Sequence, residues 1–238
     1  MKRILPFLFL LLGCSYWLAA QETAPNKTDK DGRKKGKWIF SFYEENAPAE
    51  NRSDYLTSYY IARFKKGVPV GLTREYDKTG RLIWEGHLTH ILPDTLNGIS
   101  RYFNDNGSVA AEYPMVQNRV QGMARKYYPS GALQWECNYT ADYPDGVYTE
   151  YYEDGALMRT GTVTMGQKNG SFLFYYPDGT PEKELLYAND IYQGPFTEYY
   201  ASGAVARTGT YKDGKLHGLY MKIDSASRDT SFYIYLEG

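Results

Sequence analysis

The 238-residue chain has few of the residues that most often carry chemistry, with only two cysteines and three histidines. Cys14 lies in the apolar N-terminal stretch, so Cys137 is the one thiol in the body of the chain. A disulfide framework is therefore excluded, and stability must come from packing. Cys137 stands in an alternating, strand-like run, which favours a buried structural residue over a nucleophile.

The chain also lacks an excess of charge and lacks helical patterning. It carries 27 Lys and Arg against 28 Asp and Glu, a net charge of −1. Nucleic-acid binders draw their affinity from many phosphate contacts and are usually basic, so no nucleic-acid partner is predicted. The same balance offers little to an anionic lipid surface. Beyond residue 20 no stretch has helical periodicity of useful length, which favours strands.

Catalytic and cofactor-binding motifs are missing as well. There is no Gly-x-Ser-x-Gly elbow, and the segment 161–168 lacks the lysine of a phosphate loop. His87 and His90 have a metal-like spacing, but no cysteine or third histidine is near them in the sequence. We therefore predict no enzyme activity, no cofactor and no metal.

Residues 1–20 are typical of an export signal, because Lys2 and Arg3 precede an apolar run that stops at Gln21. Two cleavage sites compete. The segment 11–14 resembles a bacterial lipobox, which would leave Cys14 lipidated and would be the protein's only membrane attachment. Cleavage after Ala20 would instead release a soluble chain. Both predict export, to the periplasm, the outer membrane or cell surface, or the medium.

The residues present in excess are 25 tyrosines and 23 glycines, and they recur at fixed intervals. A first series of glycines is spaced by 27 and then five times by 24 residues, and a second glycine follows nine positions after each of the first six: Gly80, Gly107, Gly131, Gly155, Gly179 and Gly203. This spacing predicts one repeat domain over 31–238, after a mobile leader at 21–30. Its units start near residues 36, 71, 98, 122, 146, 170, 194 and 218.

Each unit has the pattern of a β-hairpin. An alternating segment ends in a turn whose last position is the second glycine, which suits a type I turn followed by a left-handed residue. One hairpin alone is marginal in water, so the units must stack. The sequence predicts an all-β fold, an elongated single-layer antiparallel sheet of about seven tandem hairpins, with residues 219–236 as the closing hairpin.

Two columns of aromatic residues run through the repeats. The position five residues after the first glycine is always aromatic and is predicted to form a buried ladder: Tyr76, Phe103, Tyr127, Tyr151, Tyr175 and Tyr199. The next position holds the residues that we call the tyrosine row: Tyr128, Tyr152, Tyr176 and Tyr200. Because side chains alternate along a strand, the tyrosine row is expected on the opposite face with its hydroxyls in water. It is the candidate binding face, or else a cover for a thin sheet.

The run Gly-x-x-x-x-Tyr-Tyr-x-x-Gly, followed by a second strand and a turn of the form Asp-Gly-x-x-x-Gly, resembles the bacterial variant of the MORN repeat. It is also similar to the YwqK-type antitoxin family. The resemblance covers roughly residues 31–223 and implies a hairpin array for binding or scaffolding, without intrinsic catalysis. A cytosolic toxin partner does not fit an export signal.

Two functions remain open from the sequence. The first is an exported, non-catalytic scaffold that binds a partner protein of the cell envelope. The second is a glycan- or cell-wall-binding module in which the tyrosine row stacks on sugar rings. Only Trp84 and Trp135 fall at equivalent repeat positions, so the tryptophan pairs of known cell-wall-binding repeats are missing.

Overall fold

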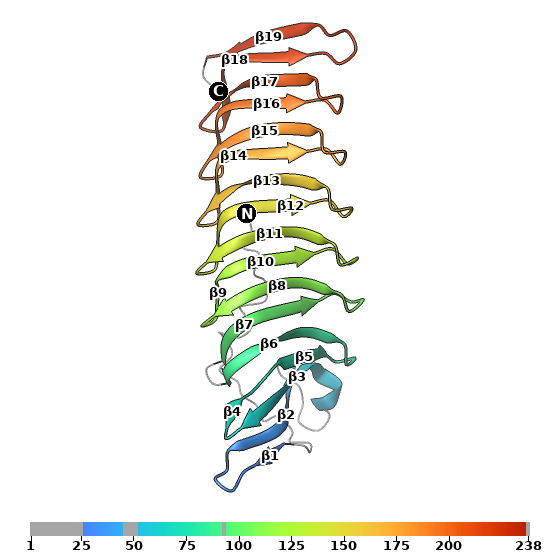
Figure 1. Ribbon diagram of the computed structural model, residues 1–238, viewed down its shortest axis with the longest axis vertical. Coiled ribbons are helices and arrows are strands. Elements are labelled where there is room, and N and C mark those ends of the chain that lie inside the picture. Colours follow the sequence, from blue (N-terminus) through green and yellow to red (C-terminus); the bar gives the residue numbers. More distant parts are fainter. Residues whose placement is uncertain (1–25, 45–51, 92–93, 237–238) are drawn as a thin grey trace. The chain divides into compact units, whose positions relative to one another are not determined.

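The computed structural model describes residues 26–44, 52–91 and 94–236. Within these ranges the protein is all-β, with nineteen strands, one 3₁₀ turn, η2 (Arg52–Tyr55), and no α-helix (Figure 1). Neighbouring strands pair antiparallel as successive hairpins. The predicted all-β antiparallel fold of tandem hairpins is thus confirmed. The proposed export signal, Cys14 and residues 21–25 lie outside the described residues.

The chain forms two compact units. The first comprises the described residues up to Gly107 together with Met115–Asn118. Pairing joins its strands in the order β1-β2-β3-β5-β6-β7, and β4 pairs with β3. The strands are β1 (Lys27–Thr28), β2 (Lys34–Tyr43), β3 (Leu56–Lys65), β4 (Val68–Pro69), β5 (Thr73–Asp77), β6 (Leu82–Ile91) and β7 (Asp94–Phe103).

The described part of the predicted leader belongs to this first unit. Lys27–Thr28 form β1 and pair with β2. The Asn26 side-chain oxygen accepts the Ile39 N–H at 2.9 Å, and the Trp38 indole N–H donates to the Lys27 carbonyl at 3.1 Å. The structure therefore corrects the prediction of a mobile leader for residues 26–30, since these side-chain bonds hold a segment that has no apolar pattern of its own.

The second unit comprises Ser108–Pro114 and the residues from Arg119 onward. Each strand from β10 to β19 pairs with the next one in sequence, and β8 pairs with β10 (Figure 1). The strands are β8 (Val109–Val116, whose last two residues belong to the first unit), β9 (Arg119–Val120), β10 (Gly122–Tyr127), β11 (Leu133–Thr140), β12 (Tyr143–Tyr151), β13 (Leu157–Thr164), β14 (Gln167–Tyr175), β15 (Pro181–Ala188), β16 (Ile191–Tyr199), β17 (Val205–Lys212), β18 (Lys215–Ile223) and β19 (Thr230–Tyr235).

Within a hairpin, the connection is a four-residue turn that ends in the second glycine. In the β12–β13 hairpin the Gly155 N–H donates to the Tyr152 carbonyl at 2.9 Å, and the pairing register shifts between Glu150 and Tyr151. This is a type I turn followed by a bulge, which requires a positive φ at its last residue. Gly155 has φ +89°, and all six second glycines have values between +80° and +91°.

Between hairpins, the connection is a two-residue turn in which both residues have positive φ. These turns recur every 24 residues at 117–118, 141–142, 165–166, 189–190 and 213–214. They have the conformation of type I′ turns, whose twist matches that of the flanking strands. The turns at 165–166 and 213–214 contain a glycine, and there the sequence predicted a turn between units, whereas the other three turns have no glycine.

Each connecting turn is anchored to the strand start one repeat earlier. The Asp142 N–H donates to the Val120 carbonyl at 3.0 Å, and the Asp142 carboxylate accepts the Val120 N–H at 2.7 Å. Asp190 makes the same two bonds with Lys168, at 3.1 and 3.0 Å. These bonds span 22 residues and fix the spacing between repeats.

The core of the second unit is a row of residues that lie opposite one another across successive strands. We call it the core row: Ala124, Cys137, Tyr148, Gly161, Phe172, Leu185, Phe196 and Gly209. Large and small residues alternate along part of it. The Phe172 ring occupies the space beside Gly161, where a Cβ atom would overlap it. Phe172 is only 1% exposed as a result.

The predicted aromatic ladder is not this core. Its members, such as Tyr127 and Tyr151, are half-buried. Tyr127 lies three residues after the buried Ala124, so strand alternation places its ring on the opposite face, where its hydroxyl donates to Glu112 at 3.0 Å. In these repeats the buried residue is therefore the one two positions after the first glycine, such as Ala124 or Phe172, and not the aromatic residue five positions after it.

Candidate functional site

The tyrosine row lies in the hairpin turns, one residue beyond the strand ends. Each phenol donates a hydrogen bond to the backbone carbonyl that lies 23 residues further along the chain. The four bonds are Tyr128 to Tyr151 at 2.9 Å, Tyr152 to Tyr175 at 2.8 Å, Tyr176 to Tyr199 at 2.9 Å and Tyr200 to Ile223 at 2.6 Å. All four tyrosines are half-buried.

These bonds give the tyrosine row a structural role between neighbouring hairpins. Each hydroxyl satisfies the carbonyl of the last strand residue in the next repeat, and burial raises the pKa of Tyr128 and Tyr152. The expectation of hydroxyls in water is corrected, because each tyrosine lies in the turn beyond its strand, where its hydroxyl donates to the backbone of the next hairpin. Ligand stacking on the half-exposed rings stays a prediction.

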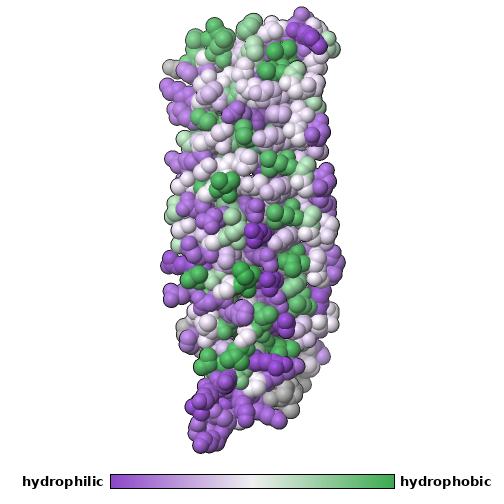
Figure 2. Space-filling view, in the orientation of Figure 1, coloured by the Kyte–Doolittle hydropathy of each residue, from purple (hydrophilic) through white to green (hydrophobic). Residues whose placement is uncertain are grey.

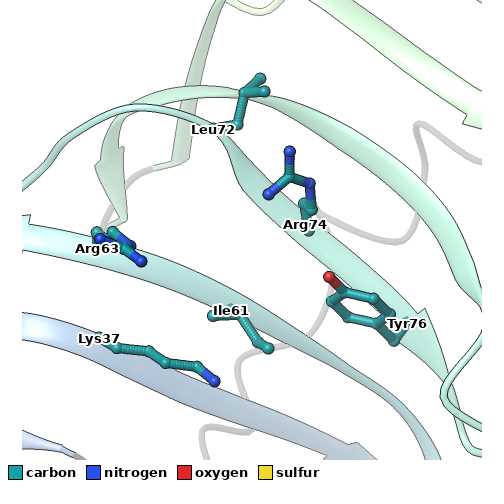
Figure 3. A pocket seen from close by; sticks show the side chains of 6 residues that line it. All are labelled: Lys37, Ile61, Arg63, Leu72, Arg74 and Tyr76. Atoms are coloured by element: carbon teal, nitrogen blue, oxygen red, sulfur yellow. The ribbon is translucent and has the colours of Figure 1, made fainter.

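A second candidate site, which the sequence did not indicate, is a pocket of about 210 Å³ in the first unit (Figure 3). Strands β2, β3 and β5 supply most of its lining residues, which are Lys37, Ile61, Arg63, Leu72, Arg74 and Tyr76. Lys37 lies opposite Arg63 across the β2–β3 pair, and Ile61 lies opposite Arg74 across the β3–β5 pair. Cross-strand partners share a face, so the sheet itself gathers these side chains.

The opposite face of the same strands holds the core of the first unit. Next to Lys37 in β2, Trp38 is buried, and next to Arg63 in β3, Ala62 and Phe64 are buried. The Phe64 and Trp38 rings pack edge to face with centroids 6.1 Å apart. The alternation of strand residues therefore fixes which side chains pack and which are left for the pocket.

The charges around the pocket are unbalanced. Glu85 is 8% exposed and accepts bonds from Arg74 at 3.1 Å and Arg101 at 3.2 Å. Lys37 and Arg63 are exposed and form no ion pair with any residue that the structure describes. Hydrophilic residues also gather over β1 and β2 (Figure 2). Two of these four cations, Arg74 and Arg101, thus pair with one carboxylate, and the other two have no such partner among the described residues, although the whole chain carries a charge of only −1.

The described residues provide little for catalysis. No group of three or more His, Cys, Asp or Glu among them could hold a metal ion. Cys137 is 1% exposed, and burial raises the pKa of its thiol to about 11, so it is a poor nucleophile at neutral pH. In the same part of the chain, no helix is long and apolar enough to cross a membrane.

Three repeats match a known family. The MORN repeat variant matches residues 144–163, 168–189 and 192–213, which correspond to β12–β13, β14–β15 and β16–β17. The chain therefore contains MORN-variant repeats, which are non-catalytic modules. No curated protein matches the sequence.

Among solved structures, the chain is similar to one described as "Crystal Structure of TcdB2-TccC3-Cdc42". The sequence identity is 13%, and the TM-score is 0.18. The match covers 82% of this chain but only 11% of that one. A similarity this weak carries no argument about function.

Proposed function

We propose that the protein is an exported, non-catalytic scaffold that binds a partner protein in the periplasm or at the cell surface. The observation that carries this proposal is the array of hairpins bonded to one another at both ends of their strands. Such an array holds surface side chains at fixed spacing and resists rearrangement, as a binding surface requires. MORN repeats are generally protein- or membrane-binding modules, and residues 1–20 support export.

The tyrosine row favours a second candidate, a glycan-binding module. Four half-exposed rings recur every two strands, about 10 Å apart by ordinary strand spacing. Aromatic rings at regular intervals suit a polymer with a regular repeat. Against this candidate, the phenol hydroxyls are already bonded to backbone carbonyls.

One experiment separates the two functions. The purified protein is immobilised and incubated with solubilised envelope from the source cells, and in parallel it is sedimented with insoluble envelope glycan. The scaffold proposal expects a protein that is captured saturably and displaced by excess free protein. Cosedimentation with glycan and no displaceable protein would favour the glycan module. Recovery of the native protein only from the cytoplasm would contradict export.

A further inference from the structure

The basic pocket of the first unit has the features of a binding site for acidic side chains. We propose that the pocket lined by Lys37, Arg63 and Arg74 binds an acidic segment of a partner protein. A carboxylate would lie between Lys37 and Arg63, and a neighbouring aliphatic side chain would contact Ile61 and Leu72. This inference rests on the proposed scaffold function and names the chemistry of its partner.

The charge distribution is the first argument. Glu85 is held by Arg74 and Arg101, so its negative charge is already shared by two guanidinium groups. Lys37 and Arg63 have no carboxylate of this kind within the described residues. Both side chains line the same pocket, where they face an open volume (Figure 3). A carboxylate would gain charge-assisted hydrogen bonds there without displacing an existing ion pair.

The size of the pocket is the second argument. Its volume of about 210 Å³ is smaller than the roughly 300–1,000 Å³ of sites that enclose whole small molecules. It suits one or two side chains of a larger ligand. Ile61 and Leu72 add an apolar contact to the charged one, so a segment with neighbouring acidic and aliphatic residues fits best. A planar lipid surface makes no use of a hollow of this size.

The rigidity of the site is the third argument. Lys37, Ile61, Arg63 and Arg74 all belong to paired strands whose other face is packed, and the Tyr76 ring stacks on Tyr59 at 5.3 Å. Sites on paired strands are held more precisely than sites on loops. The pocket is therefore largely formed before the ligand arrives.

The test uses a fluorescein-labelled peptide of alternating glutamate and leucine, with fluorescence anisotropy as the readout. We expect saturable binding that weakens as NaCl rises from 50 to 300 mM. A peptide with glutamine in place of glutamate should bind at least tenfold more weakly. The Lys37→Gln/Arg63→Gln variant should lose at least tenfold in affinity for the acidic peptide.

The matched control is Lys30→Gln/Lys78→Gln, which removes two exposed positive charges of the same unit outside the pocket. It should change the affinity less than twofold. The Lys37→Glu/Arg63→Glu variant should prefer a lysine–leucine peptide instead, which is a gain that misfolding cannot produce. Equal losses of affinity in the pocket and control variants would overturn the proposal. So would a lack of binding to the acidic peptide, or binding only to vesicles of anionic lipid. If a captured partner is nevertheless found, the scaffold function stands and the pocket assignment falls.

Discussion

Gly161 and Phe172 show how one residue controls the core row. The two residues are cross-strand partners, and the Phe172 ring lies where a Cβ atom at position 161 would be. We expect Gly161→Ala to lower the free energy of unfolding by about 1–3 kcal/mol, because overpacking forces the ring from its position. Urea unfolding measures this. The double variant Gly161→Ala/Phe172→Leu should recover part of the loss, and a single variant that unfolds like the parent would contradict the packing.

A single phenol of the tyrosine row tests its structural role. Tyr152→Phe removes the bond to the Tyr175 carbonyl and should cost about 1 kcal/mol of stability. Tyr151→Phe is the matched control, since the Tyr151 hydroxyl makes no hydrogen bond with the described residues. Chemical denaturation of both variants gives the comparison. Equal midpoints for the two variants would mean that the bond contributes nothing.

Glu75 gives the first unit a predicted pH dependence. Burial raises the pKa of its carboxyl, and a hydrogen bond from Ser58 at 2.7 Å offsets part of this effect. A raised folded-state pKa means that the folded protein favours the protonated form. The Glu75 contribution to stability is therefore fully present below the unfolded pKa and is lost as pH rises through the folded pKa.

Glu75→Gln should remove this loss, because a neutral amide fills the same space and still accepts the Ser58 bond. We expect the variant to be more stable than the parent at pH 7, with a gap that closes toward pH 4. Unfolding free energies measured from pH 4 to 8 test this. Parallel profiles for parent and variant would show that Glu75 is not responsible.

At the scale of elements, the connecting turns offer a reciprocal test. Ala141 and Asn189 occupy the same turn position, with φ of +48° and +51°. Alanine tolerates this conformation poorly, whereas asparagine adopts it readily. Ala141→Asn should stabilise by about 0.5–1 kcal/mol, and Asn189→Ala should destabilise by a similar amount. Thermal unfolding of the pair checks both signs, and changes of the same sign would contradict the turn assignment.

The elements that were predictable from sequence are those with a local signal. Glycine spacing located the hairpin turns because only a residue free of a side chain fits there at low cost. The core row was missed because its members range from Gly161 to Phe172, so their volumes complement one another instead of repeating. The connecting turns at 165–166 and 213–214 were predicted from their glycines, whereas Ala141 and Asp142 carry no glycine signal.

The candidate pocket could not be predicted for a different reason. Lys37, Arg63 and Arg74 are far apart in sequence, and only the pairing of β2, β3 and β5 brings them to one face. The net charge of the chain does not reveal the local excess of positive charge at the pocket, because acidic residues elsewhere in the chain cancel it. The tyrosine row was found, but its bonds join residues 23 positions apart in successive hairpins, so no single repeat reveals them.

At the scale of the whole molecule, bonds between repeats recur with one spacing. A deletion of residues 170–193 would leave 24-residue periodicity intact. Tyr152 would then meet the Tyr199 carbonyl, and the Phe196 ring would lie opposite Gly161. We expect this variant to fold cooperatively with a sheet-type circular dichroism spectrum and reduced stability, because nearest-neighbour terms set the stability of repeat arrays.

A deletion of residues 170–189 is the matched control. It removes a similar length but shifts every later repeat by four positions, so neither the phenols nor the connecting turns would find their partners. This variant should lose cooperative unfolding. If both deletions behave alike, the repeat spacing does not determine how hairpins join.

The bonds between successive hairpins also determine how the second unit would respond to force. A pull applied across the strands loads the hydrogen bonds between one pair of strands at a time, so hairpins would open in turn from an end. Each opening would release 24 residues, about 80 Å of extended chain. Under tension, the second unit would lengthen in equal steps while the hairpins not yet opened stayed folded.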